Sequence, residues 1–157
     1  MSDIPLIAHF FFSLVATVGF GIFFNSPIQA LAPAGITGGL GWCIYILLMK
    51  FSSSAIFANF VAAMFVSWVS EYLARKMKHP AILFVIPGII PLVPGLGLYN
   101  TMLYLVQGDY NLAISTGADT FFISGAIALG VLVITSLART LFLINLRKKM
   151  PIKIEKE

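Results

Sequence analysis

Long apolar segments dominate this chain of 157 residues and restrict what it can fold into. Hydrophobic residues make up 59% of the sequence and charged residues only 10%, far from the composition of a soluble domain. In a bilayer the backbone must satisfy its own hydrogen bonds, and a helix of about 20 residues does so. We therefore predict an all-α, polytopic membrane helix bundle forming one integral membrane domain over residues 1–157. Its five expected spans are 4–24, 34–49, 55–73, 81–106 and 117–146.

The fourth span is interrupted by the stretch PGIIPLVPGLGLYNTM, which starts at Pro87. A proline inside a helix removes a donor and leaves the carbonyl four residues earlier unpaired, at about 3 kcal/mol. Pro87, Pro91 and Pro94 should therefore break the span into two pieces, 81–94 and 98–106. Broken backbone at membrane depth is tolerated only where protein buries it or where it lines a wet cavity. The break is accordingly the first candidate for a functional site.

Two clusters of lysine and arginine predict the topology. One lies at 75–78 and the other at 147–156, and the positive-inside rule places both in the cytoplasm. An even number of crossings must separate them, so the broken fourth span is expected to be a complete crossing rather than a re-entrant hairpin. Five spans then put the N-terminus outside the cell membrane and the C-terminus in the cytoplasm. We interpret the net charge of +4 as a sign of topology and expect no nucleic-acid partner.

Small and polar residues gather on particular helical faces. Gly35 and Gly39 form a small-xxx-small pair in the second span, which allows close helix packing. In the third span one face, expected to turn inward, holds Asn59, Ala63, Ser67 and Ser70. In the fifth span one face, expected to point towards protein, holds Thr120, Ser124, Ala128, Thr135 and Arg139. We expect the glycine face of the second span and the small-residue face of the fifth to pack against a partner subunit or copies of this chain.

The ends of the two half-helices predict how the break could bind a substrate. Broken helices in transporters direct helix N-termini at anionic groups and unwound carbonyls at cations. Amides near Gly97, Leu98 and Tyr99 would face a carboxylate, and the carbonyls of Leu83, Pro87 and Ile90 would face an ammonium group. The substrate-binding hypothesis covers Pro87, Pro91, Pro94, Gly95, Gly97, Tyr99, Asn100, Thr101 and Asn59. The alternatives are a sealed structural kink, an interfacial anchor at Tyr99 and a helix-packing role for Asn59.

Two charged residues of the fifth span are candidates for gating or coupling, because a charge inside a membrane is costly. Arg139 could hold a substrate carboxylate, or its side chain could extend to lipid phosphates. Asp119 could couple transport to protons, or it could cap the helix N-terminus. The sequence has no metal-ligand cluster, no paired catalytic carboxylates and no phosphate-binding loop. We therefore expect no enzyme activity, no metal site and no cofactor.

Four pieces of the sequence together resemble a known family: the interrupted stretch that starts at Pro87, FFNSPIQAL at 23–31, GGLGW at 38–42 and the pair His79-Pro80. With these pieces the chain resembles the short second-half subunit of the threonine/serine exporter family. The resemblance implies an exporter half that works in the lipid bilayer with a larger companion subunit and with copies of itself. The implied substrates are small amino acids such as threonine and serine or, in related two-component exporters, dicarboxylates such as succinate. One departure is Gln29, where the family favours a basic residue.

Other functions fit the same features. A small channel or pore-forming bundle and a noncatalytic accessory membrane subunit would both consist of apolar helices. No Walker motif for ATP binding is present in the sequence. We therefore expect an ion gradient to drive transport if the chain belongs to a secondary exporter.

Overall fold

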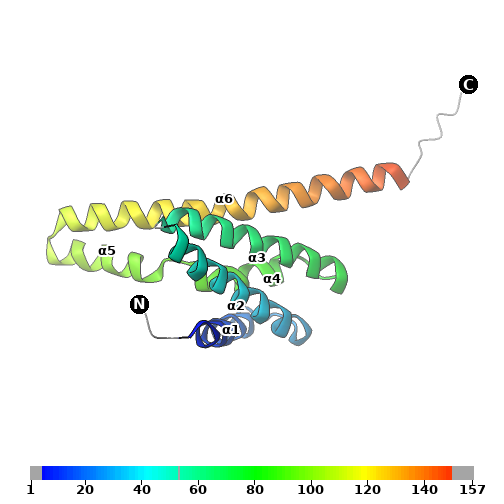
Figure 1. Ribbon diagram of the computed structural model, residues 1–157, viewed down its shortest axis with the longest axis horizontal. Coiled ribbons are helices and arrows are strands. Elements are labelled where there is room, and N and C mark those ends of the chain that lie inside the picture. The colour runs from blue at the N-terminus through cyan, green and yellow to red at the C-terminus, as the bar shows by residue number, and fades with distance from the viewer. Residues whose placement is uncertain (1–4, 53, 150–157) are drawn as a thin grey trace, which may run out of the picture.

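The computed structural model describes residues 5–52 and 54–149, and every regular element in these ranges is helical (Figure 1). The elements are α1 (Leu6–Phe23), α2 (Ile28–Phe51), α3 (Ala55–Met77), α4 (Ile82–Ile89), the 3-10 helix η1 (Ile90–Leu92), α5 (Gly95–Gln107) and α6 (Tyr110–Lys149). Four helices, α1, α2, α3 and α6, are long and apolar enough to cross a membrane, and the bent pair of α4–η1 and α5 is a fifth candidate. The predicted all-α membrane bundle is confirmed. The expectations for Ile4, Lys153 and Lys156 lie outside the described residues.

Glycines bring α1, α2 and α3 into close contact. A Cβ added at Gly35 of α2 would lie 2.6 Å from Val18 of α1, and Gly38 packs against Thr17 of α1. Gly41, on the other side of α2, packs against Val66 of α3. The expectation that this glycine face packs against a partner subunit is therefore wrong, because two helices of the same chain already fill it.

The centre of the bundle consists of two clusters of buried residues, and α3 contributes to both. One contains Ala62, Ala63, Val66, Leu92 and Ile127, and the other contains Ala30, Ala34, Ala74 and Phe84. The polar face of α3 also turns inward, since Asn59, Ser67 and Ser70 are all buried. This part of the sequence prediction is confirmed, and α3 is the helix around which α2, α4 and α6 pack.

Helices α3 and α6 run in the same direction. Gly130 of α6 lies against Phe60 of α3, and further along both helices Arg75 donates to the carbonyl of Ala138. Helix α4 and η1 run the opposite way along α3, because Phe84 packs with Ala74 while Leu92 packs with Ala62. The chain thus returns along α3 before α6 begins, which is the connectivity that a complete crossing requires.

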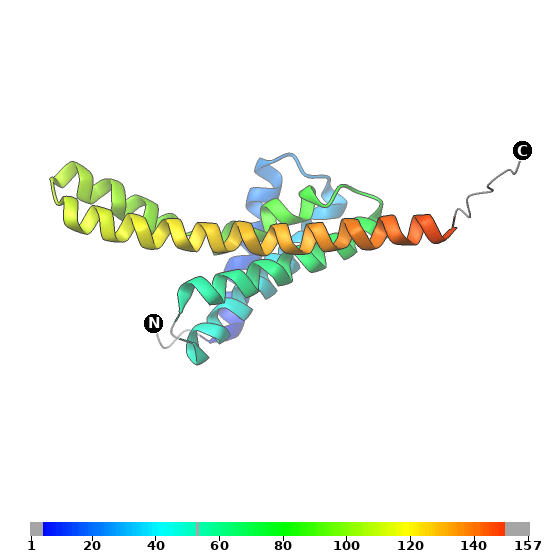
Figure 2. The ribbon, with the colours of Figure 1, turned by 90° about the horizontal axis from the view of Figure 1, so that it is seen from above.

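The longest helix, α6, extends beyond the bundle at both ends (Figures 1 and 2). It has 40 residues and is about 60 Å long at about 1.5 Å per residue. Its start pairs with α5 to form a helical hairpin, in which Gly97 packs against Thr120 and Gly117 against Thr101. No residue of α5 is buried. This hairpin therefore reaches away from the other helices.

Three helix starts differ from the prediction by three residues or more, and one of them is that of α5, which begins at Gly95 rather than at 98. Helix α2 begins at Ile28 rather than Ala34, with Pro33 inside it; the burial of Ala30 and Ala34 against α3 and α4 favours this earlier turn. Helix α6 begins at Tyr110 rather than 117, because Gly108 ends α5 with a φ of 80° and Asp109 caps a new helix directly after it.

Candidate functional site

The backbone of the break satisfies most of its own hydrogen bonds. The amide of Ile90 donates to the carbonyl of Pro87, and the amide of Val93 donates to that of Ile90 at 3.2 Å. These are the tighter bonds of a 3-10 turn, which recover acceptors that an α-helix with prolines would leave unpaired. Two of the three carbonyls predicted to face a cation are therefore already paired within the chain.

The N-terminus of α5 offers fewer free amides than predicted. The amide of Leu98 donates to the carbonyl of Pro94 at 3.1 Å, and that of Gly95 donates to Val93 at 2.8 Å. Since α5 begins at Gly95, Tyr99 lies beyond the first turn, where amides bond within the helix. Of the predicted amide donors, only that of Gly97 belongs to the unpaired first turn.

The side chains predicted to bind substrate do not form one cluster. Pro87 and Asn59 are buried in the bundle, and Asn59 donates to the carbonyl of Ala55 at 2.8 Å. Tyr99 is 63% exposed, and Thr101 donates to the carbonyl of Gly97 at 2.7 Å. The remaining predicted residues are exposed or half-buried around the 56° bend between α4–η1 and α5: Pro91, Pro94, Gly95 and Asn100.

Two charged residues of α6, Asp119 and Arg139, lie at opposite ends of an apolar stretch. Asp119 is exposed to the surroundings and lies within α6, well after the start of the helix at Tyr110. Its predicted role as a helix cap is therefore wrong. The residue that caps α6 is Asp109, whose carboxylate accepts a hydrogen bond from the amide of Leu112 at 3.3 Å. Arg139 is exposed as well, but it lines a pocket.

The polar face of α6 lies mostly on the surface of this chain, so its packing against a companion or copies of the chain stays a prediction. Ser124 and Ala128 are exposed, and only Thr120 of that set is buried. The buried line of α6 instead runs through Ala126 and Gly130, because Gly130 allows the closest approach of α3.

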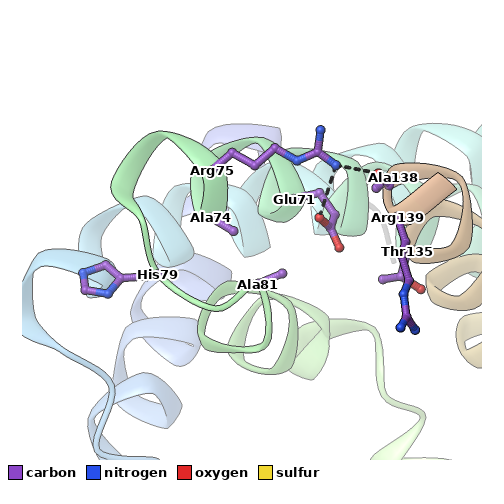
Figure 3. Close-up of a pocket in the computed structure, with 8 residues that line it drawn as sticks. All are labelled: Glu71, Ala74, Arg75, His79, Ala81, Thr135, Ala138 and Arg139. Carbon is purple, nitrogen blue, oxygen red and sulfur yellow. Dashed lines mark hydrogen bonds and ion pairs between the residues drawn. The ribbon is translucent and has the colours of Figure 1, made fainter. Parts of the chain in front are cut away.

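The pocket that contains Arg139 lies at the basic end of the bundle and is lined by several polar side chains (Figure 3). Its volume is about 440 Å³, within the range of about 300–1,000 Å³ that small-molecule sites occupy. Residues from the end of α3, the following loop and α6 line it: Glu71, Ala74, Arg75, His79, Ala81, Thr135, Ala138 and Arg139. A second cavity of about 510 Å³ lies among phenylalanines of α3 and α6 and offers little polar chemistry.

Within the polar pocket, Arg75 is held in place by two neighbours. Its guanidinium donates to the carbonyl of Ala138 at 2.8 Å and lies 3.8 Å from the carboxylate of Glu71. The first bond ties α3 to α6, and the second is an i,i+4 pair along α3. No ion pair joins Arg139 to another of the described residues.

Two hydroxyls of α3 are buried, and one of them lies opposite the first proline of the break. Ser67 and Ser70 have no hydrogen-bond partner among the described residues. Ser70 lies between Val66 and Ala74 on the face of α3 that packs against α4. It therefore sits opposite the part of α4 that contains Pro87, where the helix has lost a donor.

The sequence does not show that the residues of this pocket lie together. Glu71 and Arg75 had a visible i,i+4 spacing, but nothing in the sequence pairs α3 with a helix more than 60 residues later in the chain. His79 was noted only as part of a motif. The contact between Arg75 and Ala138 is tertiary, so only the fold brings these groups together.

Long apolar helices, a helix broken at prolines and a charged pocket at one end define a multi-pass membrane protein with a discontinuous helix, an arrangement found in transporters. The comparison with known families is specific. The family described as Threonine/Serine exporter, ThrE, matches residues 9–137. The chain belongs to this family.

The chain is also similar to an uncharacterized protein of Haemophilus influenzae. The two are 31% identical over 137 residues, which cover 82% of this chain and 46% of the relative. The chain therefore matches less than half the length of that relative. No solved structure matches the chain.

Proposed function

We propose that this chain is one subunit of a secondary-active exporter of small amino acids such as threonine and serine, or of dicarboxylates, in the cytoplasmic membrane. Membership of the Threonine/Serine exporter family supports the export role. The observation that carries the proposal is the broken segment α4–η1–α5, of which α4 and η1 run antiparallel to α3 before the bend into α5. Helices interrupted in this way are typical of transporter binding sites.

The charges of α6 support a placement of the bilayer. Asp119 and Arg139 bound an uncharged stretch, 120–138, which is about 28 Å long at about 1.5 Å per residue. This length matches a hydrocarbon core of about 30 Å. The basic end, with Arg75 and Arg139, then faces the cytoplasm, and the hairpin of α5 with the start of α6 lies at the outer side.

A companion subunit completes the exporter in this proposal. The similar Haemophilus protein is more than twice as long as its matched part, so a second part accompanies the matched region there. In the present system a separate, larger chain would supply that part. An ion gradient would drive transport, and copies of this chain would join the assembly.

The test is counterflow in proteoliposomes that contain this chain with and without a larger exporter half. Threonine, serine and succinate are the substrates, and we expect saturable, gradient-dependent flux only with both chains present. Pro91→Ala and Pro94→Ala should slow transport, while Pro27→Ala, which removes a proline outside the break, should not. An ohmic current without saturation would instead indicate a channel, and full activity of this chain alone would refute the companion subunit.

A further inference from the structure

The polar pocket at the basic end presents opposite charges to the same cavity. The carboxylate of Glu71 and the guanidinium of Arg139 both line it, and they come from two different helices. In Figure 3 both groups are directed to the same side of the α3–α6 pair, with Thr135 close to Arg139. The cavity is therefore bounded by an anion, a cation and a hydroxyl.

The two arginines of the pocket differ in what they can still bind. Arg75 already contacts the carbonyl of Ala138 and the carboxylate of Glu71, so its role is to hold the walls together. Arg139 has no ion-pair partner among the described residues. A guanidinium binds a carboxylate with two parallel hydrogen bonds, so Arg139 is the group that can receive an oxyanion.

The acceptors of the pocket suit an ammonium group and a hydroxyl. Glu71 lies 3.8 Å from Arg75, longer than a direct charged hydrogen bond of about 2.7–2.9 Å, so its oxygens retain capacity for another donor. Thr135 donates its own hydrogen to the carbonyl of Val131 at 2.9 Å. Its oxygen can therefore only accept, which suits a ligand that carries a hydroxyl.

The geometry points to this pocket as a binding site for a zwitterionic, hydroxyl-bearing amino acid, with its carboxylate on Arg139, its ammonium group near Glu71 and its hydroxyl near Thr135. The inference rests on the proposed function, because it makes the pocket the place where an exporter takes substrate from the cytoplasm. It also favours amino acids over dicarboxylates, since Glu71 repels a second carboxylate.

Binding of radiolabelled L-threonine to the purified full chain tests the site without requiring transport. In nanodiscs of neutral lipid we expect Arg139→Gln and Glu71→Gln each to raise the Kd for threonine about tenfold or more, because each removes a charged hydrogen-bond partner. Glu71→Gln should at the same time lower the Kd for succinate. Lys76→Gln is the matched control, because it removes an exposed charge from the last turn of α3 outside the pocket. Kd values within twofold of the wild type for both pocket variants would overturn the site.

A lipid headgroup carries the same oxyanion chemistry as a carboxylate, so a second arm uses nanodiscs with anionic phosphatidylglycerol. Retained, Arg139-dependent threonine binding in these discs supports the substrate site. If anionic lipid binds through Arg139 and threonine does not bind in either disc, the pocket is a lipid site and the inference fails.

Measurements of transport distinguish a failure of the pocket as a binding site from a failure of the proposed exporter function. If the wild type exports threonine with its companion and the pocket variants keep the same KM, the pocket is not the substrate site although the exporter function stands. If threonine binds through Glu71 and Arg139 but no flux is seen, the pocket stands and the exporter function fails. Circular dichroism of each variant checks that it folds, and Arg139→Lys should restore part of the binding.

Discussion

Gly130 sets how closely α3 and α6 approach, and a single methyl group there should force them apart. A Cβ at this position would lie 2.7 Å from the carbonyl oxygen of Phe60 and 3.1 Å from the Cβ of Ala63. Carbon–oxygen contacts normally fall at about 3.3–3.6 Å, so α3 must move by at least about 0.6 Å. A backbone oxygen cannot rotate away as a side chain can. Overpacking typically costs about 1–3 kcal/mol, and we expect Gly130→Ala to lower the free energy of unfolding by this amount.

Gly125 provides a matched control on the same helix, since a Cβ there would have nothing within 4 Å. Gly125→Ala should be neutral or stabilising, because alanine favours a helix over glycine by up to about 1 kcal/mol. Unfolding in mixed detergent micelles can be followed by the reaction of a thiol dye with the single cysteine, Cys43. Unfolding free energies that agree within about 0.5 kcal/mol for the two variants would refute the close approach of α3 and α6.

Further predictions concern the α5–α6 hairpin and the wall of the pocket. Asp109→Ala should destabilise the protein by about 0.5–2 kcal/mol, because it removes the side chain that caps α6; Asp109→Asn should not, and the same thiol-dye assay decides. Gly108→Ala should lower the free energy of unfolding by about 1–2 kcal/mol, since φ is 80° there. Gly95→Ala should leave the free energy of unfolding unchanged, because a Cβ at that position would have nothing within 4 Å. Arg75→Gln should weaken threonine binding together with stability, because Arg75 bonds across to α6; weaker binding with unchanged stability would contradict its role in holding the pocket wall.

The helices and the inward face of α3 could be predicted from the sequence because they depend on local pattern. Apolar length marks a membrane helix, and a repeat near 3.6 residues places Asn59, Ser67 and Ser70 on one face. The start of α2 could not be predicted in this way. Pro33 argues for a later start, but the packing of Ala30 and Ala34 against α3 and α4 outweighs it.

The location of the break could also be predicted, but not how it is sealed. The prolines of the break predict unpaired backbone carbonyls. In the structure, however, the carbonyls of Pro87 and Ile90 accept hydrogen bonds in the tighter 3-10 turns at η1. Whether a stranded group finds a local partner depends on backbone angles that the sequence does not specify. The pocket depends even more on tertiary structure, because Glu71 and Arg139 meet only after α6 has docked on α3.

The pocket and the break lie at different depths of the bundle, so variants at each should affect different steps. Leu92 packs with Ile127, and Gly97 packs against Thr120, which places the break beside residues 120–127 of α6, on the N-terminal side of Arg139. In the proposed bilayer placement the pocket then faces the cytoplasm and the break lies in the outer half of the membrane. The packed interface of α3 and α4, with the unpaired hydroxyl of Ser70, lies between the pocket and the break. Changes in the pocket should therefore alter affinity on the cytoplasmic side, and changes at the prolines should alter the rate of passage while leaving that affinity intact.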